Sequence, residues 1–246
     1  MKTFRADFHI HTVLSPCGDL GMSPKNIIRR AKERKLDIIG ITDHNSTKQC
    51  SVMKKIGDKN GIFVLQGVEI TTKEEVHCLA FFENDDELSK FQKYLDQNLP
   101  DIKNNVDLFG YQVVVDEDEN IVEQIDPLLI SAISQNINQI EEKVHSLGGL
   151  FIPAHIDKLK NSIISQLGFL PKDLNIDAIE LSKHTTKKNF LDKNDYLKQY
   201  SFIQSSDAHY INNIGDVSTI LKMNEISFNE IKQALANING RKTIIE

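Results

Sequence analysis

Residues 37–45 read DIIGITDHN, a short apolar run that ends in three polar residues. A nearly continuous run of aliphatic residues is typical of a strand buried on both faces of a parallel sheet. Asp43, His44 and Asn45 then stand at the carboxyl end of that strand. The segment therefore predicts a parallel sheet whose strand ends carry polar, chemically active side chains.

Similar runs occur along the rest of the chain and alternate with stretches of helical periodicity. The helical stretches lie near residues 85–98, 128–147 and 227–237, and Ser23 and Pro24 are expected to begin a further helix. Alternating strands and helices are typical of an α/β barrel or a doubly wound sheet. The other expected strands are residues 4–10, 62–70, 76–82, 150–155, 177–182 and 202–207.

The composition is that of an ordinary globular protein. The chain has 246 residues, of which 40% are hydrophobic and 26% charged, so disordered, collagenous and coiled-coil classes are excluded. A net charge of −6 argues against a broad nucleic-acid-binding surface, although a local basic channel is compatible with it. The start of the chain lacks the apolar region of a secretory signal, and no apolar run could span a bilayer. With three scattered cysteines, these features predict a cytoplasmic protein without a membrane segment.

No Gly/Ser-rich linker, low-complexity tract or internal repeat divides the chain, so we expect a single domain over residues 1–246. The main irregularity is an acidic turn, residues 116–119, between two β-type runs. It predicts a hairpin inserted at about residues 108–124. Consecutive acidic side chains on an extended chain point apart, which favours a solvated loop tip over a cation site.

Most of the eight histidines share one topological position, near an end of an expected strand, and carboxylates stand at equivalent positions. The carboxyl ends of strands in a parallel barrel or open sheet meet on one face, so these groups should converge on one crevice. Imidazole and carboxylate are ligands of Zn, Mn and Fe, which predicts a metal site. The residues are His9, His11, His44, His77, His155 and His209, with Asp7, Asp43, Glu69, Glu180 and Asp207.

His9 and His11 lie two residues apart on an expected strand, so their rings point to the same side and can reach one ion. The pair alone is weak evidence, because a shuffled chain with this histidine content would show about a quarter of one such pair. The shared location of six histidines is the stronger argument. His145 lies inside an expected helix and is interpreted as structural.

The order of these motifs resembles that of the PHP family, the polymerase and histidinol phosphatase domain. The resemblance runs from residue 5 to about 210. It implies a distorted (β/α)7 barrel, a TIM-like fold, with two or three divalent ions at its C-terminal face and hydrolysis of phosphoesters. The motifs are Asp7–His11 (DFHIH), Thr42–His44 (TDH), Gly67–Ile70 (GVEI), His77, Pro153–His155 (PAH) and Ser206–His209 (SDAH).

The same resemblance implies how the ligands are shared among the ions. Glu69 would bridge the first and second ions. Asp7 and Asp43 are interpreted as acceptors that orient neighbouring ligands. In a loop where some relatives have histidine, Asp19 would help to hold the third ion. The ligand sets would be His9, His11, Glu69 and Asp207 for the first ion, Glu69, His77 and His155 for the second, and Asp19, His44 and His209 for the third.

The chemistry expected of such a site is attack of a metal-activated hydroxide on phosphorus, with Glu69 and Asp207 essential because they hold the ions. His184 is a candidate to protonate the leaving group. Substrate contacts are predicted for three residues, each of which could equally be an ordinary surface or turn residue. They are Lys158, Lys183 and Ser15.

The favoured function is a phosphatase acting on a small phosphomonoester, such as a nucleotide or a phosphorylated metabolite like histidinol phosphate, because only scattered lysines are available to bind a polymer. A phosphodiesterase or 3′–5′ exonuclease is the first alternative, and it would need a basic track leading to the site. A non-catalytic metal-binding regulatory module is disfavoured because every expected ligand position is filled. Amidohydrolase-like C–N hydrolysis ranks lower, since the motif order resembles PHP more closely. The sequence leaves open the substrate, the choice among Mn, Zn and Fe, and the oligomeric state.

Overall fold

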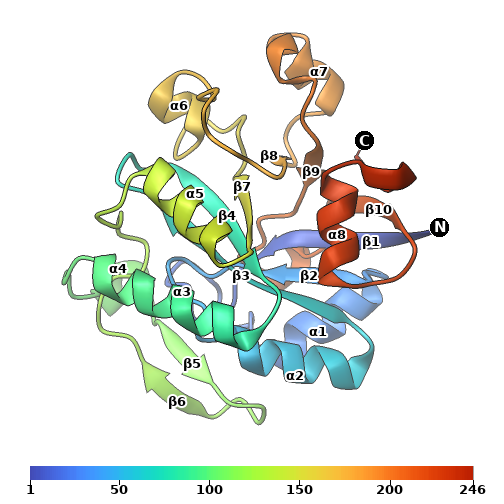
Figure 1. The fold of residues 1–246 in the computed structure, drawn as a ribbon. Helices are drawn as coiled ribbons and strands as arrows, with labels where there is room; N and C mark the ends of the chain where they lie inside the picture. Colours follow the sequence, from blue (N-terminus) through green and yellow to red (C-terminus); the bar gives the residue numbers. More distant parts are fainter. Residues whose placement is uncertain (246) are drawn as a thin grey trace.

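A strongly curved sheet forms the centre of the computed structural model, which describes residues 1–245 (Figure 1). Seven strands follow the order β11-β10-β1-β2-β3-β4-β7, and β8 and β9 form a separate parallel pair. These strands are β1 (Lys2–Ile10), β2 (Ile38–Ile41), β3 (Phe63–Thr71), β4 (His77–Phe82), β7 (Leu150–Pro153), β8 (Ile179–Leu181), β9 (Phe202–Gln204), β10 (Thr219–Met223) and β11 (Lys242–Ile244).

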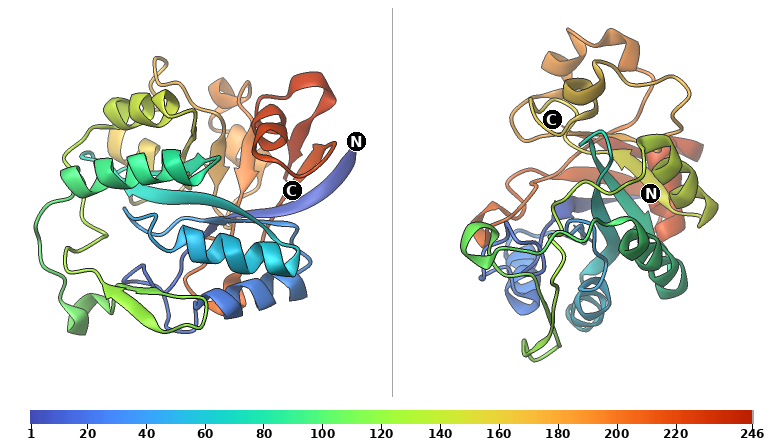
Figure 2. Two further views of the ribbon diagram at one scale, coloured as in Figure 1. Left: turned by 60° about the horizontal axis from the view of Figure 1, so that its bottom comes forward. Right: turned by 90° about the vertical axis from the view of Figure 1, so that its left-hand side faces the viewer.

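The β8–β9 pair lies between the two limbs of the curved sheet and brings them towards closure. A parallel bridge joins Ile10, at the end of β1, to Ala208, just after β9. On the other side, the amide of Ile156, just after β7, donates to the carbonyl of Glu180 in β8. The predicted TIM-like fold is therefore confirmed as a curled half-barrel sheet with helices around it, which Figure 2 shows from two further sides.

β4 runs against its neighbours, and its direction matters for the site. β1, β2 and β3 are parallel, whereas β4 is antiparallel to both β3 and β7. Thr71 at the end of β3 pairs with His77 at the start of β4. His77 therefore lies on the same face as the carboxyl ends of the parallel strands, although it begins its own strand.

The described residues form eight α-helices, and an apolar cluster packs α1, α2, α3 and α5 against the sheet. A second cluster joins α8 to β1, β3, β4 and β7. Both clusters leave the polar strand ends on one side. The helices are α1 (Pro24–Glu33), α2 (Cys50–Asn60), α3 (Asp85–Asn98), α4 (Val106–Phe109), α5 (Ile137–Ser146), α6 (Ile163–Leu167), α7 (Lys187–Leu191) and α8 (Phe228–Leu235), with 3-10 turns at Asp195–Leu197, Ile211–Asn213 and Ile238–Gly240.

Local capping explains where the predicted helices begin. α3 occupies the expected residues 85–98, and the Asn84 side chain accepts hydrogen bonds from two amides of its first turn. The helix predicted at 128–147 begins only at Ile137, because Asn136 forms a capping box there. Ser23 stands at the N-cap position of α1 as expected, but its side chain makes no capping hydrogen bond.

The segments outside the barrel lie at opposite edges of the molecule in Figure 1. β5 (Val113–Val115) and β6 (Ile121–Gln124) form an antiparallel hairpin at the lower edge, and its acidic turn contacts Lys25 and Lys59. α6 and α7 stand at the upper edge. None of the described helices is long and apolar enough to cross a membrane.

Candidate metal centre

Six histidines and two carboxylates converge where the strands of the barrel end. Neighbouring imidazole rings have centroids between 4.1 and 6.2 Å apart, and most of these side chains are buried. They come from β1, β3 and β4 and from the segments that follow β1, β2, β7 and β9. The residues brought together are His9, His11, His44, His77, His155 and His209, with Glu69 and Asp207.

Four of these side chains surround one point. Nε2 of His9 lies 3.2 Å from Nε2 of His11, and both nitrogens lie 3.4 Å from oxygens of Glu69. Oδ1 of Asp207 is 3.4 Å from Nε2 of His9 and 3.5 Å from Nε2 of His11. Ligands about 2.0–2.1 Å from a tetrahedral ion are separated by about 3.3–3.4 Å, so the four groups are spaced as a zinc-like ion requires.

Glu69 connects this group to the remaining histidines. Its Oε1 lies 2.8 Å from Nδ1 of His77 and 3.2 Å from Nε2 of His155. Its Oε2 lies 3.1 Å from Nδ1 of His44. His44, Glu69 and His77 form a second group with metal-ligand spacing. One carboxylate therefore lies between two sets of imidazoles.

The chemistry of the donor set fits a metal ion. Nδ1 of His44 is buried and points at Glu69, yet it makes no hydrogen bond within the described part of the chain. A buried ring nitrogen without a partner costs free energy unless an ion or a water molecule satisfies it. The mixture of imidazole and carboxylate suits Zn, Mn and Fe. These residues can thus hold divalent ions.

The third predicted ligand set is only partly assembled. His44 and His209 lie with His11 in one group of possible ligands. Asp19, in contrast, is exposed, and its Oδ1 accepts a hydrogen bond of 2.7 Å from the amide of Gly21. Its backbone amide donates to the carbonyl of His209, so the loop is anchored near the centre while the carboxylate caps its own turn.

Burial and the charges of neighbouring side chains shift the pKa values of the buried groups. Burial opposes ionisation of Glu69, yet the imidazoles of His77, His9 and His44 hold its pKa well below the usual range. Burial also opposes charging of His9, but Glu180, Glu69 and Asp207 outweigh it and raise its pKa well above the ordinary value. Because a metal ion binds the unprotonated ring, the raised pKa of His9 would make metal binding at this nitrogen depend on pH.

Glu180 and Ser15 orient His9, near the end of β1, and His11, just after it. Oε2 of Glu180 is 3.0 Å from Nδ1 of His9 and also accepts the amide of His155, which turns Nε2 of His9 towards the centre. Ser15 donates to Asp43 at 2.7 Å and lies 2.9 Å from Nδ1 of His11. Ser15, predicted to bind substrate, instead lies between Asp43 and the candidate ligand His11, so it can orient that ring.

Asp7 also accepts hydrogen bonds, but its donors are backbone amides and not imidazole rings. Its two oxygens accept the amides of Ser206 and Gly215, each at 2.9 Å. Burial raises the pKa of Asp7 to about 6. This carboxylate therefore fixes the segment that carries Asp207, and among the described residues its hydrogen bonds come from backbone amides.

Asn161 is a site residue that the sequence reasoning missed. Its Nδ2 lies 2.7 Å from Nε2 of His77, and its carbonyl accepts the amide of His77 at 2.8 Å. Asn161 adopts a left-handed backbone conformation with φ of 58°. Asparagine tolerates that conformation well, and its place just before the N-cap Ser162 was the only available signal.

The two lysines predicted to bind substrate and the predicted proton donor His184 lie in different places in the structure. Lys158 pairs with Oδ2 of Asp207 and lines a cavity of about 250 Å³ over the ligand cluster. Lys183 instead donates to Asp216 at 3.3 Å, so its ammonium group is engaged outside that cavity. His184 is exposed and lines the neighbouring cavity, apart from the three groups of possible ligands.

Comparison with known proteins identifies the family. The PHP domain model matches residues 7–242. The chain belongs to the PHP domain family. The resemblance inferred from the motifs is thereby confirmed.

Two curated relatives are themselves uncharacterised. The Methanocaldococcus jannaschii protein MJ1587 is 34% identical over 90 residues, which cover 33% of this chain and 52% of that protein. YqxK of Bacillus subtilis is 25% identical over an alignment covering 99% of this chain and 65% of that protein. The chain thus spans between about half and two thirds of the length of these relatives.

Solved structures share the fold. The lesion-specific endonuclease PfuEndoQ from Pyrococcus furiosus aligns with a TM-score of 0.73 and 19% identity, covering 98% of this chain and 58% of that chain. A candidate metal-dependent phosphoesterase from Bifidobacterium adolescentis aligns with a TM-score of 0.60 and 18% identity, covering 94% of this chain and 95% of that chain. At these identities the likeness establishes the barrel architecture alone.

Proposed function

We propose that this chain hydrolyses phosphoesters with two or three bound divalent ions, and that its substrate is a small phosphomonoester. The position of Glu69 supports this most strongly, because its two oxygens face ring nitrogens of five histidines at 2.8–3.4 Å. A carboxylate placed between two sets of imidazoles is suited to bridge two ions. Mn, Zn and Fe all fit the donor set.

The chain's own residues would bind the phosphate group and assist its departure. When bound, the ions would polarise the phosphoryl group and lower the pKa of water. Lys158 lies at the mouth of the cavity, where its ammonium group can donate a hydrogen bond to a phosphoryl oxygen. His184 lies one cavity further out and is our proposed proton donor to the leaving oxygen.

The charge balance of the centre favours an anionic substrate. Glu69 and Asp207 bring two negative charges, so two divalent ions would leave the centre positive. His44 and His209 add ligands without adding charge, because burial lowers the pKa of His44 well below the ordinary value and that of His209 to about 4. A positive cavity in a chain of net charge −6 suits a phosphate dianion.

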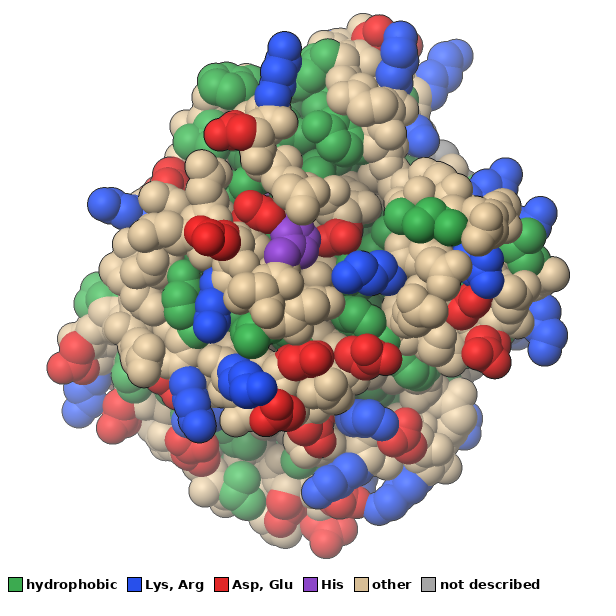
Figure 3. All heavy atoms as spheres, viewed as in Figure 1, with side chains coloured by type: hydrophobic (Ala, Val, Ile, Leu, Met, Phe, Trp, Pro, Cys, Tyr) green, Lys and Arg blue, Asp and Glu red, His purple; other side chains and the backbone are tan. Residues whose placement is uncertain are grey.

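The size of the cavity and the charge on the surface favour a small substrate over a polymer. The cavity above the candidate ligands has a volume of about 250 Å³, which suits a small phosphorylated molecule. On the face shown in Figure 3, basic and acidic side chains are interspersed and form no continuous basic band. A polymer would gain little affinity from such a surface.

A phosphodiesterase or exonuclease is the second candidate. One solved relative, Endonuclease Q, was crystallised with a 27-mer duplex that carries an abasic lesion at its active site, and it has the same fold with a TM-score of 0.73. Lys158 and Lys160 both line the mouth of the cavity here. Those two lysines would be the start of the basic track that this candidate requires.

The test is phosphate release by metal-stripped protein after Mn, Zn or Fe is added back. p-Nitrophenyl phosphate and bis(p-nitrophenyl) phosphate form a matched monoester and diester pair, with histidinol phosphate as a metabolite. We expect metal-dependent monoester hydrolysis that falls by orders of magnitude in Glu69→Gln and persists in the exposed control Glu142→Gln. Faster diester cleavage would favour the nuclease, and bound metal without turnover would favour a regulatory module.

A further inference from the structure

The first helix carries a concentration of positive charge in an acidic chain. Residues 24–35 read PKNIIRRAKERK and contain six basic side chains and one acidic side chain, whereas the net charge of the whole chain is −6. Lys25, Arg29 and Lys32 follow one another at spacings of four and three residues, so they lie along one face of α1. At a rise of about 1.5 Å per residue, this row of cations is about 10 Å long.

The row forms one wall of a groove between α1 and α2, which lie side by side in Figure 1. The groove has a volume of about 640 Å³, and Lys59, near the end of α2, also lines it. Ile28 and Ile56 lie beneath it and are only 2% and 6% exposed, so a ligand would meet the charged side chains above them. None of the candidate metal ligands lines this groove.

Two of the four cations that line the groove have no acidic partner within residues 1–245. The guanidinium of Arg29 donates to the side chain of Asn26 at 2.9 Å and forms no ion pair there. Lys32 is exposed and likewise forms no ion pair in this part of the chain. Glu33, the acidic side chain of α1 at the groove, pairs with Arg30 at 3.0 Å. Positive charge is therefore left without a counter-charge.

The acidic turn of the β5–β6 hairpin engages the other two cations. Asp118 lies 3.6 Å from the ammonium group of Lys25, and Glu117 pairs with Lys59. The left-hand view of Figure 2 shows the hairpin beside the two helices. All four side chains are at least 37% exposed, and ion pairs exposed to this degree contribute little to stability. The turn therefore acts as a weakly bound internal ligand at one end of the groove.

The turn does not need the two helices to keep its shape. Oδ1 of Asp116 accepts the backbone amides of Asp118 and Asn120, each at 2.9 Å. These hydrogen bonds close the turn on itself, as an aspartate commonly does at such a position. The carboxylates can therefore move off Lys25 and Lys59 without unfolding the hairpin.

We propose that the groove between α1 and α2 binds the phosphate chain of an oligophosphate, which takes the place of the acidic turn on Lys25 and Lys59. Phosphate oxygens accept charge-assisted hydrogen bonds from lysine and, in pairs, from arginine. A chain of linked phosphates presents negative charge along its whole length, as a row of cations requires. An acidic peptide matches the row less well, because successive side chains of an extended chain point to opposite sides.

Equilibrium dialysis of inorganic tripolyphosphate against the full chain tests the site. Arg29→Gln combined with Lys32→Gln removes the two unpaired cations, and both residues are exposed. The control removes the same charge outside the groove, with Lys90→Gln and Lys232→Gln at exposed positions on α3 and α8. We expect the affinity to fall at least tenfold in the first variant and less than twofold in the control. No binding by wild type, or equal losses in the two variants, would overturn the proposal.

Removing the internal competitor should have the opposite effect. Glu117→Gln combined with Asp118→Asn frees Lys25 and Lys59, so tripolyphosphate should bind at least threefold more tightly. Glu142→Gln with Asp173→Asn makes the same change in charge at exposed positions away from the groove. If the affinity does not rise, or rises equally in this control, the oligophosphate does not compete with the turn.

Two further arms identify the ligand and separate the groove from the metal centre. Tripolyphosphate and ATP carry the same group in free form and on a nucleoside, so the tighter of the two names the source, whereas tighter binding of hexaglutamate would replace the proposal with an acidic peptide site. Glu69→Gln should retain the binding, because Glu69 does not line the groove. Failure of the proposed function would appear as absent phosphate release and would leave this binding unchanged.

Discussion

The side-chain amide of Asn161 lies 2.7 Å from Nε2 of His77, and the carbonyl of the same residue accepts the His77 amide at 2.8 Å. Asn161 immediately precedes the N-cap of α6. The segment that covers the metal centre is therefore tied to one of the predicted ligands. Because the bond occupies Nε2, it leaves Nδ1 facing Glu69 at 2.8 Å.

Removing the Asn161 side chain should weaken metal binding. Asn161→Gly is the suitable change, because glycine keeps the left-handed backbone conformation that alanine would strain. Loss of a partner that orients a ligand typically lowers metal affinity about 10–100-fold. The measurement is competitive titration of the stripped protein with Zn²⁺ against a chromophoric chelator. Asn239→Gly, at an exposed residue with φ of 53°, is the control, and equal affinities for both variants would contradict the role of Asn161.

Lys158→Ala should separate substrate binding from metal binding. The ammonium group pairs with Asp207, so its removal frees that carboxylate, and metal affinity should be unchanged or higher. Loss of a charge-assisted hydrogen bond to phosphate should lower kcat/KM by about 10–100-fold. The comparison is Lys183→Ala, whose ammonium group pairs with Asp216. Weaker metal binding in Lys158→Ala would show that the lysine supports the centre instead.

Much of the barrel could be predicted from the sequence because buried parallel strands are short apolar runs that end in polar residues. The strand predicted at 62–70 matches β3 to within one residue at each end, and the helix predicted at 85–98 matches α3. β10 and β11 were not predicted, since they lie at the antiparallel edge of the sheet, where partly or fully exposed positions interrupt the apolar run. The late start of α5 depends on the capping box of Asn136, which periodicity alone does not reveal.

The site was predictable to the extent that its residues lie at strand ends. His77 belongs to the cluster because β4 is antiparallel, and that direction cannot be derived from the composition of the strand. Loop residues were harder to place. Ser15 and Lys183 have partners, Asp43 and Asp216, that are distant in sequence, and Asn161 is positioned by a backbone turn. Side-chain direction in a loop follows from tertiary contacts, which a single sequence does not show.

Metal binding should release protons near neutral pH. Before a metal binds, His9 and His11 have raised pKa values, because the carboxylates around them outweigh the effect of burial. A metal ion requires the unprotonated rings, so affinity should fall as the pH decreases through these raised pKa values. Isothermal titration calorimetry with Zn²⁺ at pH 7, in two buffers of different ionisation enthalpy, should show release of about one proton or more. Identical heats in both buffers would mean that the rings are already unprotonated.

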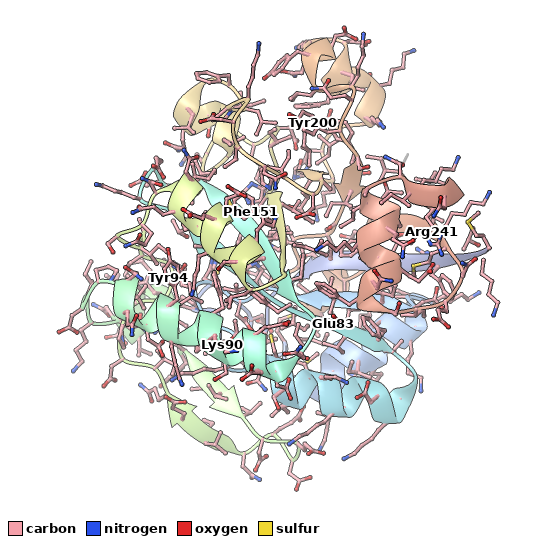
Figure 4. The ribbon with its side chains drawn as sticks, in the orientation of Figure 1. Glu83, Lys90, Tyr94, Phe151, Tyr200 and Arg241 are labelled. Carbon is pink, nitrogen blue, oxygen red and sulfur yellow. The ribbon has the colours of Figure 1, made fainter. Side chains whose placement is uncertain are left out.

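His145, predicted to be structural, should make stability depend on pH. Its Nδ1 lies 2.5 Å from Glu141 and its Nε2 lies 3.0 Å from Asp177, which also accepts the amide of Phe151, labelled on β7 in Figure 4. The hydrogen bond to Asp177, followed by that to Glu141, raises the pKa of His145 against partial burial. The folded protein thus holds this proton more tightly than the unfolded chain, so the stabilisation is complete below about pH 6.5 and is lost as the pH rises through the raised value.

His145→Gln should therefore unfold at a lower temperature than wild type at pH 6, by about 2–4 °C, since a partly exposed ion pair contributes roughly 1 kcal/mol or less. The deficit should shrink as the pH is raised towards 9, because wild type then loses the charged ring as well. Thermal unfolding followed by circular dichroism at both pH values measures this difference in unfolding temperature. His184→Gln is the control, because His184 is exposed. A deficit that is the same at both pH values would assign the role of His145 to its contact with the Phe151 ring, 6.5 Å away between centroids, and not to its charge.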